Sequence, residues 1–351
     1  MSISREAVLK ALSHVDDPDL HKDVVTLGMI ENLTIEGLNV SFDLVLTTPA
    51  CPMKDMMVSA CKNAVVYMVD AAAKVHVNAT SRVVQNERTS DTLSGVKQVI
   101  AVASGKGGVG KSTVSATLAL ALSKSGAKVG LLDADIYGPS IPTLFKVHQA
   151  PEMVELNGKN VMKPIESHGI KLLSIGFMTA PGQAVVWRGP MISSAFRQFL
   201  NDVDWGDLDY LVIDLPPGTG DVQITLAQQA PLSGIVVVTT PQEMALTDAR
   251  RAIDMFQLDS IAKPILGVVE NMSYFVPDDD ITKKYHIFGQ GGGQKLASEF
   301  GVPFLGELPL RTGIGLAADQ GNWDFDLEIM KPYMALAGEV ARQISLKSVS
   351  L

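Results

Sequence analysis

The feature that most constrains the fold is a glycine-rich loop placed between an apolar strand and a helix. Residues 99–103 are all apolar, as expected of a buried strand, and a helix is predicted to begin near Lys111. Between them, residues 105–112 match the pattern Gly-x-x-x-x-Gly-Lys-Ser. A strand, this loop and a helix in that order are typical of a site that holds phosphate groups.

The chemistry of such a loop follows from its residues. Its glycines let the backbone curl so that the N–H groups face inward at a helix N-terminus, where anions bind. Lys111 is then expected to reach the β- and γ-phosphates, and Ser112 to ligate Mg²⁺. An ordinary glycine-rich turn is the alternative, but the complete motif favours a site for Mg-ATP. The predicted nucleotide-binding residues of the loop are Gly105, Lys106, Gly107, Gly108, Val109, Gly110, Lys111, Ser112 and Thr113.

A second lysine, Lys106, lies inside the same loop, although an ordinary phosphate-binding loop does not need it. A cation on the first turn of the loop points away from its own nucleotide. One role for Lys106 is therefore to reach phosphates held by a second subunit, as a catalytic finger acting in trans. The alternative is that Lys106 is an ordinary loop lysine exposed to solvent. If Lys106 is considered without the rest of the chain, this second interpretation is favoured.

Acidic residues follow two of the predicted strands. Asp133 and Asp135 come at the end of the strand at 129–133, and Asp214 ends the strand at 210–214. Because ligands bind at the carboxyl ends of parallel strands, we expect these carboxylates to complete the site. Asp214 is suited to hold a Mg²⁺-bound water, and Asp135 to orient or activate the attacking water. Helix capping or turn formation is the alternative, and it fits Asp133 better than the other two.

The pattern from residue 96 onward predicts an α/β fold. Short apolar β-rich runs alternate with segments of helical length, which indicates a mainly parallel sheet with helices on both sides. One helix is expected to have Thr240 as its N-cap, Pro241 at the first helical position and Glu243 as a capping-box residue. The predicted strands cover residues 99–103, 129–133, 170–175, 210–214, 235–239, 265–270 and 304–308.

The first 84 residues predict a small α+β domain. The alternating apolar residues Val40, Phe42, Leu44 and Leu46 suit a strand with one buried face. We expect the polar stretch at 85–96 to be a linker and residues 97–351 to form the ATPase domain. The predicted elements of the small domain are helices at 4–15 and 55–72 and strands at 29–35, 40–46 and 75–84.

Composition excludes several classes of function. A formal net charge of −9 argues against a broad electrostatic contact with nucleic acid. No apolar run approaches the roughly 18 residues that cross a bilayer, and residues 330–346 are predicted to be a packing helix rather than a membrane anchor. The N-terminus lacks a signal-peptide pattern, and the 2 cysteines suggest no disulfide framework. A cytoplasmic protein without nucleic-acid or membrane partners is therefore expected.

Several motifs together resemble a known family. Residues 106–113 are similar to the deviant Walker A motif of the MinD/ParA/nitrogenase-iron-protein class, in which the extra lysine acts across a dimer. Over residues 97–345 the chain resembles the Mrp/ApbC-type iron–sulfur cluster carriers, and residues 1–84 resemble the SufT-like domain often fused to them. The motifs that carry these resemblances are residues 133–140, 187–190, 214–221 and 270–273 for the carriers and 17–19, 27–28 and 48–52 for the small domain.

The resemblance implies a homodimeric, Mg-dependent ATPase that binds a [4Fe-4S] cluster and transfers it to apoproteins. Its partners would be a second copy of the chain, apo client proteins and cluster donors. By the same resemblance Lys106, Lys111, Ser112, Asp135 and Asp214 are nucleotide and switch residues, and Asn271 recognises the adenine ring. A MinD/ParA-like switch without a cluster is the alternative. A third possibility is an enzyme that phosphorylates a small substrate, but nothing in the sequence indicates a pocket for such an acceptor.

One departure from the family concerns the cluster ligands. Many members have Cys-x-x-Cys shortly after the Asn-Met-Ser segment, but residues 273–280 contain no cysteine, so the usual four-thiolate bridging site cannot form. Cys51 precedes a predicted helix start, where N–H groups would stabilise a thiolate, and is a candidate ligand; a small buried cysteine is the alternative. Cys61 shares a helical face with Met57, Val65 and Met68, which favours core packing. As the alternative, Cys61 is a second candidate cluster ligand, because two cysteines per chain would supply four thiolates in a dimer if the small domains meet.

Overall fold

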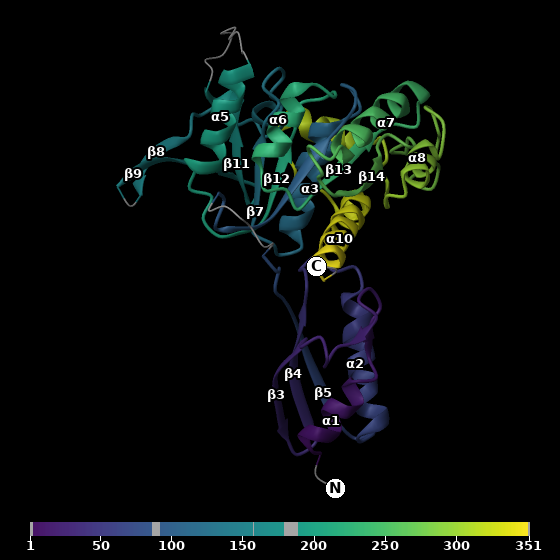
Figure 1. The fold of residues 1–351 in the computed structure, drawn as a ribbon. Helices are drawn as coiled ribbons and strands as arrows, with labels where there is room; N and C mark the ends of the chain where they lie inside the picture. Colours follow the sequence, from purple (N-terminus) through teal and green to yellow (C-terminus); the bar gives the residue numbers. More distant parts are fainter. Residues whose placement is uncertain (1–2, 86–91, 157, 179–188, 350–351) are drawn as a thin grey trace. The chain divides into compact units, whose positions relative to one another are not determined.

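The chain folds into two compact units, which are described here separately. The computed structural model describes residues 3–85, 92–156, 158–178 and 189–349 (Figure 1). The first unit comprises residues 1–84 together with 341–351, and the second comprises residues 85–340. The division therefore differs from the predicted one at the C-terminal end, where residues 341–351 cluster with the small domain.

The first unit is a three-stranded sheet with two helices. The central strand β4 (Asn39–Leu46) pairs antiparallel with β3 (Ile30–Glu36) and parallel with β5 (Lys74–Ser81). The helices α1 (Arg5–Leu12) and α2 (Lys54–Met68) lie side by side along this sheet (Figure 1). The predicted α+β architecture of this domain is confirmed, with two additional very short strands, β1 (Asp16–Asp17) and β2 (Lys22–Asp23), that pair with each other.

The alternation in β4 decides which face of this sheet is buried. Val40, Phe42, Leu44 and Leu46 are all at most 2% exposed, as predicted from their period of two. The helix at α1 begins where Ser4 caps it, since the Ser4 Oγ accepts a hydrogen bond from the N–H of Ala7 at 3.1 Å. A sheet face and two helix faces thus form one small core.

Helix α2 is shorter than the predicted helix at 55–72. Met57, Cys61 and Val65 are buried on its inner face, as expected. Met68 is 53% exposed, so its predicted place on the same face is wrong. The reason is that α2 ends at Met68, one turn earlier than predicted, and its last residue lies beyond the edge of the core.

The second unit is built on an eight-stranded sheet in the order β10-β11-β7-β12-β6-β13-β14-β15. All neighbouring strands are parallel except β10 and β11. The seven predicted strands are confirmed as β6, β7 and β11 to β15, and the short edge strand β10 was not predicted. Their bounds are β6 (Val96–Ala103), β7 (Val129–Asp133), β10 (Ile165–Ser167), β11 (Ile170–Ser174), β12 (Leu208–Asp214), β13 (Gly234–Thr239), β14 (Ile265–Glu270) and β15 (Phe304–Glu307).

Helices cover both faces of this sheet. Val99 and Ala101 of β6 share one core with apolar residues of α5 (Gly189–Asn201), α6 (Asp221–Gln229), α7 (Glu243–Gln257) and α8 (Gly292–Phe300). Successive strand residues point to opposite faces, so Ile100 and Val102 face the other side, where α3 (Lys111–Lys124) packs on β6, β7 and β12. The remaining elements are α4 (Ile141–Leu144), the hairpin β8 (Glu152–Leu156) and β9 (Lys159–Lys163), the 3₁₀ helix η1 (Ile175–Met178), α9 (Thr312–Gln320) and α10 (Leu327–Val349).

Two helix predictions have different outcomes. Residues 330–346 lie in α10 and pack as expected, with Met330, Leu336 and Val340 almost fully buried. Within the part of the chain that the structure describes, no helix is both long and apolar enough to cross a membrane. The predicted N-cap Thr240 is wrong, because α7 begins at Glu243 and the Glu243 carboxylate binds Arg250 at 2.9 Å instead of folding back to cap the helix.

The core of the first unit gives a stability prediction. Phe42 is 1% exposed, so Phe42→Ala in the full chain should lower the free energy of unfolding of this unit by about 3–5 kcal/mol. Leu38→Ala, at a position 42% exposed, is the matched control and should change it by less than about 0.5 kcal/mol. Hydrogen exchange of the β4 amides measures both, and equal protection in the two variants would contradict the assigned core.

Candidate functional site

The glycine-rich loop lies at the carboxyl end of β6, between the neighbouring strands β12 and β13. Helix α3 begins directly after it at Lys111, with Gly110 as the N-cap in the left-handed region at φ 81°. Gly105 and Gly110 are required by close approach: a Cβ at Gly105 would overlap the Asp248 backbone of α7, and one at Gly110 would overlap the Asn271 side chain. The loop is therefore held tightly on both sides.

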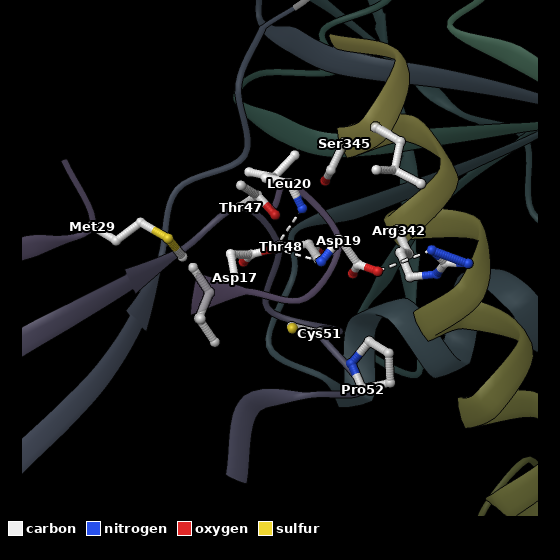
Figure 2. A pocket seen from close by; sticks show the side chains of 12 residues that line it. Asp17, Asp19, Leu20, Met29, Thr47, Thr48, Cys51, Pro52, Arg342 and Ser345 are labelled. Atoms are coloured by element: carbon white, nitrogen blue, oxygen red, sulfur yellow. Dashed lines mark hydrogen bonds and ion pairs between the residues drawn. The ribbon is translucent and has the colours of Figure 1, made fainter. Parts of the chain in front are cut away.

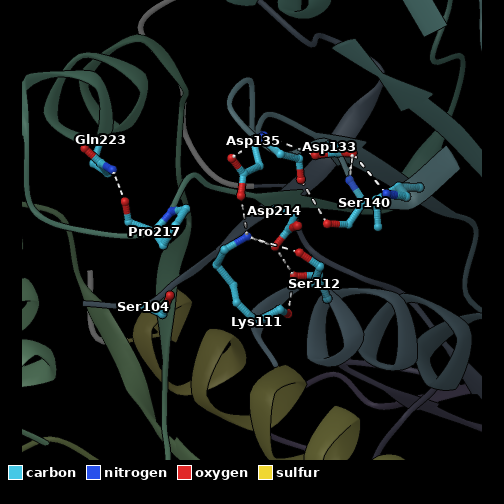
Figure 3. Close-up of polar contacts among 12 residues, drawn as sticks. Ser104, Lys111, Ser112, Asp133, Asp135, Ser140, Asp214, Pro217 and Gln223 are labelled. Carbon is cyan, nitrogen blue, oxygen red and sulfur yellow. Dashed lines mark hydrogen bonds and ion pairs between the residues drawn. The ribbon is translucent and has the colours of Figure 1, made fainter. Parts of the chain in front are cut away.

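Lys111 is the charge at the centre of the site (Figure 3). Its ammonium donates a hydrogen bond to the Asp214 Oδ1 at 2.7 Å and lies 3.7 Å from the Asp135 Oδ2. It also donates to the Ser112 Oγ at 3.3 Å. Lys111 is 6% exposed and Asp214 is fully buried, so these charges are compensated by one another rather than by water.

Asp214 has one oxygen engaged and one available. Its Oδ1 accepts from Lys111 and also from the Ser115 Oγ at 2.7 Å. Its Oδ2 is buried and has no hydrogen-bond partner among the described residues. A buried carboxylate oxygen without a donor suits a ligand such as a metal-bound water, and it fits the role predicted for Asp214. Ser115 was not singled out from the sequence, because a serine in a helix gives no signal of its own.

Asp133 has a structural role, as its alternative interpretation proposed. It lies directly opposite Asp214 in the pairing of β7 with β12, and burial together with the Asp214 charge raises its pKa. Its carboxylate closes the turn into α4 by accepting several hydrogen bonds. The donors are the backbone N–H groups of Asp135 at 3.1 Å, Ser140 at 3.0 Å and Ile141 at 3.1 Å, and the Ser174 Oγ at 2.9 Å.

Asp135 differs from Asp133 in that it faces Lys111 of the glycine-rich loop. Burial raises its pKa, the nearby Lys111 ammonium lowers it and the Asp214 charge raises it, with a net upward shift. Its Oδ1 accepts from the Gly138 N–H at 3.3 Å, while its Oδ2 faces Lys111. The three strand-end carboxylates predicted from the sequence are therefore brought together, two of them on Lys111 and one in a turn.

The turn after Asp214 is tied to the same loop. The Gly218 N–H donates to the Ser104 carbonyl at 2.8 Å, immediately before the glycine-rich segment. The Gln223 side chain of α6 holds the turn from the other end: its Nε2 donates to the Pro217 carbonyl at 2.5 Å and its Oε1 accepts from the Gly220 N–H at 3.0 Å. Gln223 is a second residue that sequence reasoning missed.

Asn271 contacts the loop directly. Its Nδ2 donates to the Val109 carbonyl at 2.9 Å, and it is 7% exposed. This contact supports the loop from the end of β14, and recognition of an adenine ring by Asn271 stays a prediction. The preceding residue, Glu270, is fully buried and anchors the start of α8, where its Oε2 accepts from the Gly293 N–H at 2.5 Å.

Lys106 is exposed, and its backbone carbonyl accepts from the Ser104 Oγ at 2.9 Å. The structure gives its side chain no ion pair within the described ranges of the chain. Both the trans-acting and the solvated interpretation of Lys106 therefore stay predictions. Of the motif at 187–190, residues 187 and 188 lie outside the described residues, and Gly189 and Pro190 begin α5.

Comparison with known proteins places the chain in a family. Residues 95–345 match the family model described as NUBPL iron-transfer P-loop NTPase, and residues 5–79 match that of an iron–sulfur cluster assembly protein. An iron–sulfur cluster carrier protein of Deinococcus radiodurans is 47% identical over 350 residues, covering 98% of this chain and 97% of the relative. The chain belongs to the iron–sulfur cluster carrier family of P-loop NTPases.

Solved structures agree with this assignment. A nucleotide-binding protein of Archaeoglobus fulgidus in complex with ADP is 38% identical, with a TM-score of 0.57 over 67% of this chain and 93% of that chain. The MinD cell division ATPase of Pyrococcus furiosus is 21% identical, with a TM-score of 0.50 over 69% of this chain and 98% of that chain, and it shares the fold alone. The predicted P-loop fold of MinD type is confirmed.

In this carrier the two cysteines have unequal surroundings. Cys61 is fully buried in the core of the first unit, and burial raises its pKa to about 11. Cys51 is partly buried, and burial is also the largest cause that raises its pKa, followed in the same direction by Asp17 and Asp19. The N–H groups of Met53 and Lys54 favour the thiolate, as expected, but they do not outweigh burial.

No group of three or more His, Cys, Asp or Glu side chains in the described part of this chain is arranged to hold a metal ion. One chain of this carrier therefore brings no complete set of cluster ligands together within those residues. Any cluster bound through Cys51 would need further ligands from a second chain, a client or a donor.

The buried Lys111 generates a prediction about stability. Lys111→Ala should lower the free energy of unfolding of the second unit by about 3–5 kcal/mol near neutral pH, since buried carboxylates lose their cation. Asp133 and Asp135 have raised pKa values in the folded state, so the folded chain binds protons more readily and the loss should shrink at about pH 5.5.

The exposed lysine Lys124, on the same helix, provides the control. Lys124→Ala should change stability by less than about 0.5 kcal/mol at either pH. Urea denaturation at the two pH values measures both variants. If Lys111→Ala lowers the free energy of unfolding only slightly, or lowers it more as the pH falls, then Lys111 is not what compensates the buried carboxylates.

Proposed function

We propose that this chain is an ATP-hydrolysing carrier that works as a homodimer, takes up an iron–sulfur cluster and transfers it to apoproteins. The observation that carries the proposal is the buried Lys111, held on Asp214 at the phosphate-binding loop of a chain from the cluster carrier family. A cation paired with carboxylates in this way is ready to exchange them for phosphate oxygens. A cytoplasmic location stays a prediction that accompanies this proposal.

In the proposed mechanism, nucleotide binding transfers Lys111 from the carboxylates to the β- and γ-phosphates. The backbone N–H groups of the loop and the N-terminus of α3 receive the same phosphates. Ser112 and, through a water, the free Oδ2 of Asp214 would hold Mg²⁺, which when bound neutralises charge on the phosphate oxygens. Asp135, released from Lys111, orients the attacking water.

The contacts of the site also connect the nucleotide to helix α6. The turn at 216–218 hydrogen-bonds the end of β6 through Gly218 and the start of α6 through Gln223. A γ-phosphate that displaces Lys111 from Asp214 changes the contacts of a residue two positions before this turn. We infer that this turn reports the nucleotide state to α6.

The proposal of a homodimer is based on Lys106. Its exposed side chain has no ion pair to satisfy it within the described residues, and the loop that carries it matches the motif whose extra lysine acts across a dimer. Placed on the partner's phosphates, Lys106 would stabilise charge that develops as the γ-phosphate leaves.

For the cluster itself we propose Cys51 as the ligand from this chain. Cys61 lies in a core and does not enter the proposal. A dimer supplies two Cys51 thiolates, so the [4Fe-4S] cluster implied by the resemblance would take its other two ligands from outside the dimer. Transfer to a client is then an exchange in which client thiolates replace Cys51 on iron, without a change in redox state.

Lys106→Ala tests the dimeric ATPase. We expect ATP hydrolysis per chain to rise with protein concentration in the unchanged protein and to fall by about a hundredfold or more in the variant, while nucleotide affinity changes little. Lys124→Ala is the matched control, since it removes another exposed lysine, at the far end of α3 from the loop, and should leave hydrolysis unchanged. Persistent hydrolysis in Lys106→Ala would make the trans-acting role wrong.

Anaerobic reconstitution with iron and sulfide tests the cluster ligand. The unchanged protein should bind iron with thiolate-to-iron absorbance and pass it to an apo-enzyme, Cys51→Ala should lose both, and Cys61→Ala should keep them. If the unchanged protein binds no iron, the cargo is not a cluster. Equal iron in Cys51→Ala would exclude Cys51 as the ligand.

A further inference from the structure

A small cavity lies beside Cys51 in the first unit (Figure 2). Its wall is formed on one side by Asp17 and Asp19 and by the segment that carries Cys51. On the other side it is formed by the end of α10, through Arg342 and Ser345. All of these residues belong to the first unit, because residues 341–351 cluster with the small domain.

An ion pair holds the end of α10 at this wall. The Arg342 Nη1 donates to the Asp19 Oδ1 at 3.0 Å, and the two side chains are only 30% and 26% exposed. Ile344, two residues further along the helix, is 4% exposed. The helix end therefore rests against the loop rather than standing free of it.

The turn at residues 17–20 places Asp19 where it can form the ion pair with Arg342. The buried carboxylate of Asp17 accepts from the N–H groups of Asp19 and Leu20, both at 2.9 Å. These bonds form a tight turn that fixes the backbone at Asp19 and leaves its side chain for the ion pair.

The size of the cavity decides what Cys51 can hold in this arrangement. Its volume is about 20 Å³, which is room for a single water molecule. A cluster of iron and sulfide ions is much larger than one water and does not fit between Cys51 and the helix end. Cargo can therefore reach the Cys51 sulfur from the side of this cavity only if the end of α10 moves.

We propose that residues 342–346 form a lid over Cys51, and that the Asp19–Arg342 ion pair is its latch. The lid excludes cargo and other thiol reagents when closed, and breaking the latch exposes the thiol. This inference deepens the proposed function, since it assigns control of access to the proposed cluster ligand. The lid can be tested on iron-free protein, so its failure is distinguishable from a failure of the carrier proposal.

The experiment measures alkylation of Cys51 by iodoacetamide in the full chain, followed by peptide mass spectrometry. Arg342→Glu places like charges at the latch and should accelerate labelling by about twofold to fivefold, the range of a partly exposed ion pair. The exchange of both charges, Asp19→Arg with Arg342→Glu, should return labelling to the slow rate. Arg82→Glu is the matched control, because it breaks an exposed ion pair with Glu31 in the same unit.

Electrostatics cannot mimic the expected result. A new carboxylate near Cys51 raises the pKa of its thiol and by itself slows alkylation, so faster labelling reports access. Cys61 is fully buried and must stay unlabelled in a folded unit; if it reacts in Arg342→Glu, Arg342→Gln is judged by the same criterion. Labelling of Cys51 that is unchanged or slower, or fast labelling that the exchanged pair does not reverse, would overturn the lid.

Discussion

The structure of the nucleotide site depends on one buried cation. Lys111 lies against Asp214 and Asp135, with Asp133 opposite Asp214 at the end of β7, in a place where water contributes almost nothing. Buried carboxylates are tolerable there only because the ammonium compensates them. The same pairing aligns the loop with the ends of β7 and β12, so an electrostatic requirement fixes the geometry into which phosphate groups can enter.

The contacts around Lys111 hold the backbone of the glycine-rich loop in place. Asn271 holds the Val109 carbonyl from β14, and the Asp248 backbone of α7 closes on Gly105. On the other side the turn after Asp214 is bound to Ser104 and to Gln223. Exchange of Lys111 from carboxylate to phosphate would therefore be felt first at Asp214 and its turn, since the loop is held by fixed partners at Gly105 and Val109.

The proposed cluster ligand Cys51 and the phosphate-binding loop belong to different units of the chain. The segment after Asn271, where the resemblance leads one to expect a cysteine pair, has none, and the only partly accessible thiol belongs to the other unit. That thiol and the end of α10 line the same cavity, which admits one water. The proposed lid offers a physical reason why a carrier with so few thiols would protect the one it has.

Much of this protein was determined by local sequence. The apolar runs predicted all seven parallel strands, the period of two predicted the buried residues of β4, and the loop motif with Asp135 and Asp214 predicted the members of the site, because each is a short-range pattern. Contacts between distant residues were decided only by the tertiary structure. Ser115 and Gln223 became part of the site through hydrogen bonds to Asp214 and to the turn that follows it, and the C-terminal segment joined the small domain, where Arg342 pairs with Asp19. Whether a thiol is exposed or covered depends on which chain segment lies over it, and no local pattern around Cys51 encodes a helix end nearly three hundred residues away.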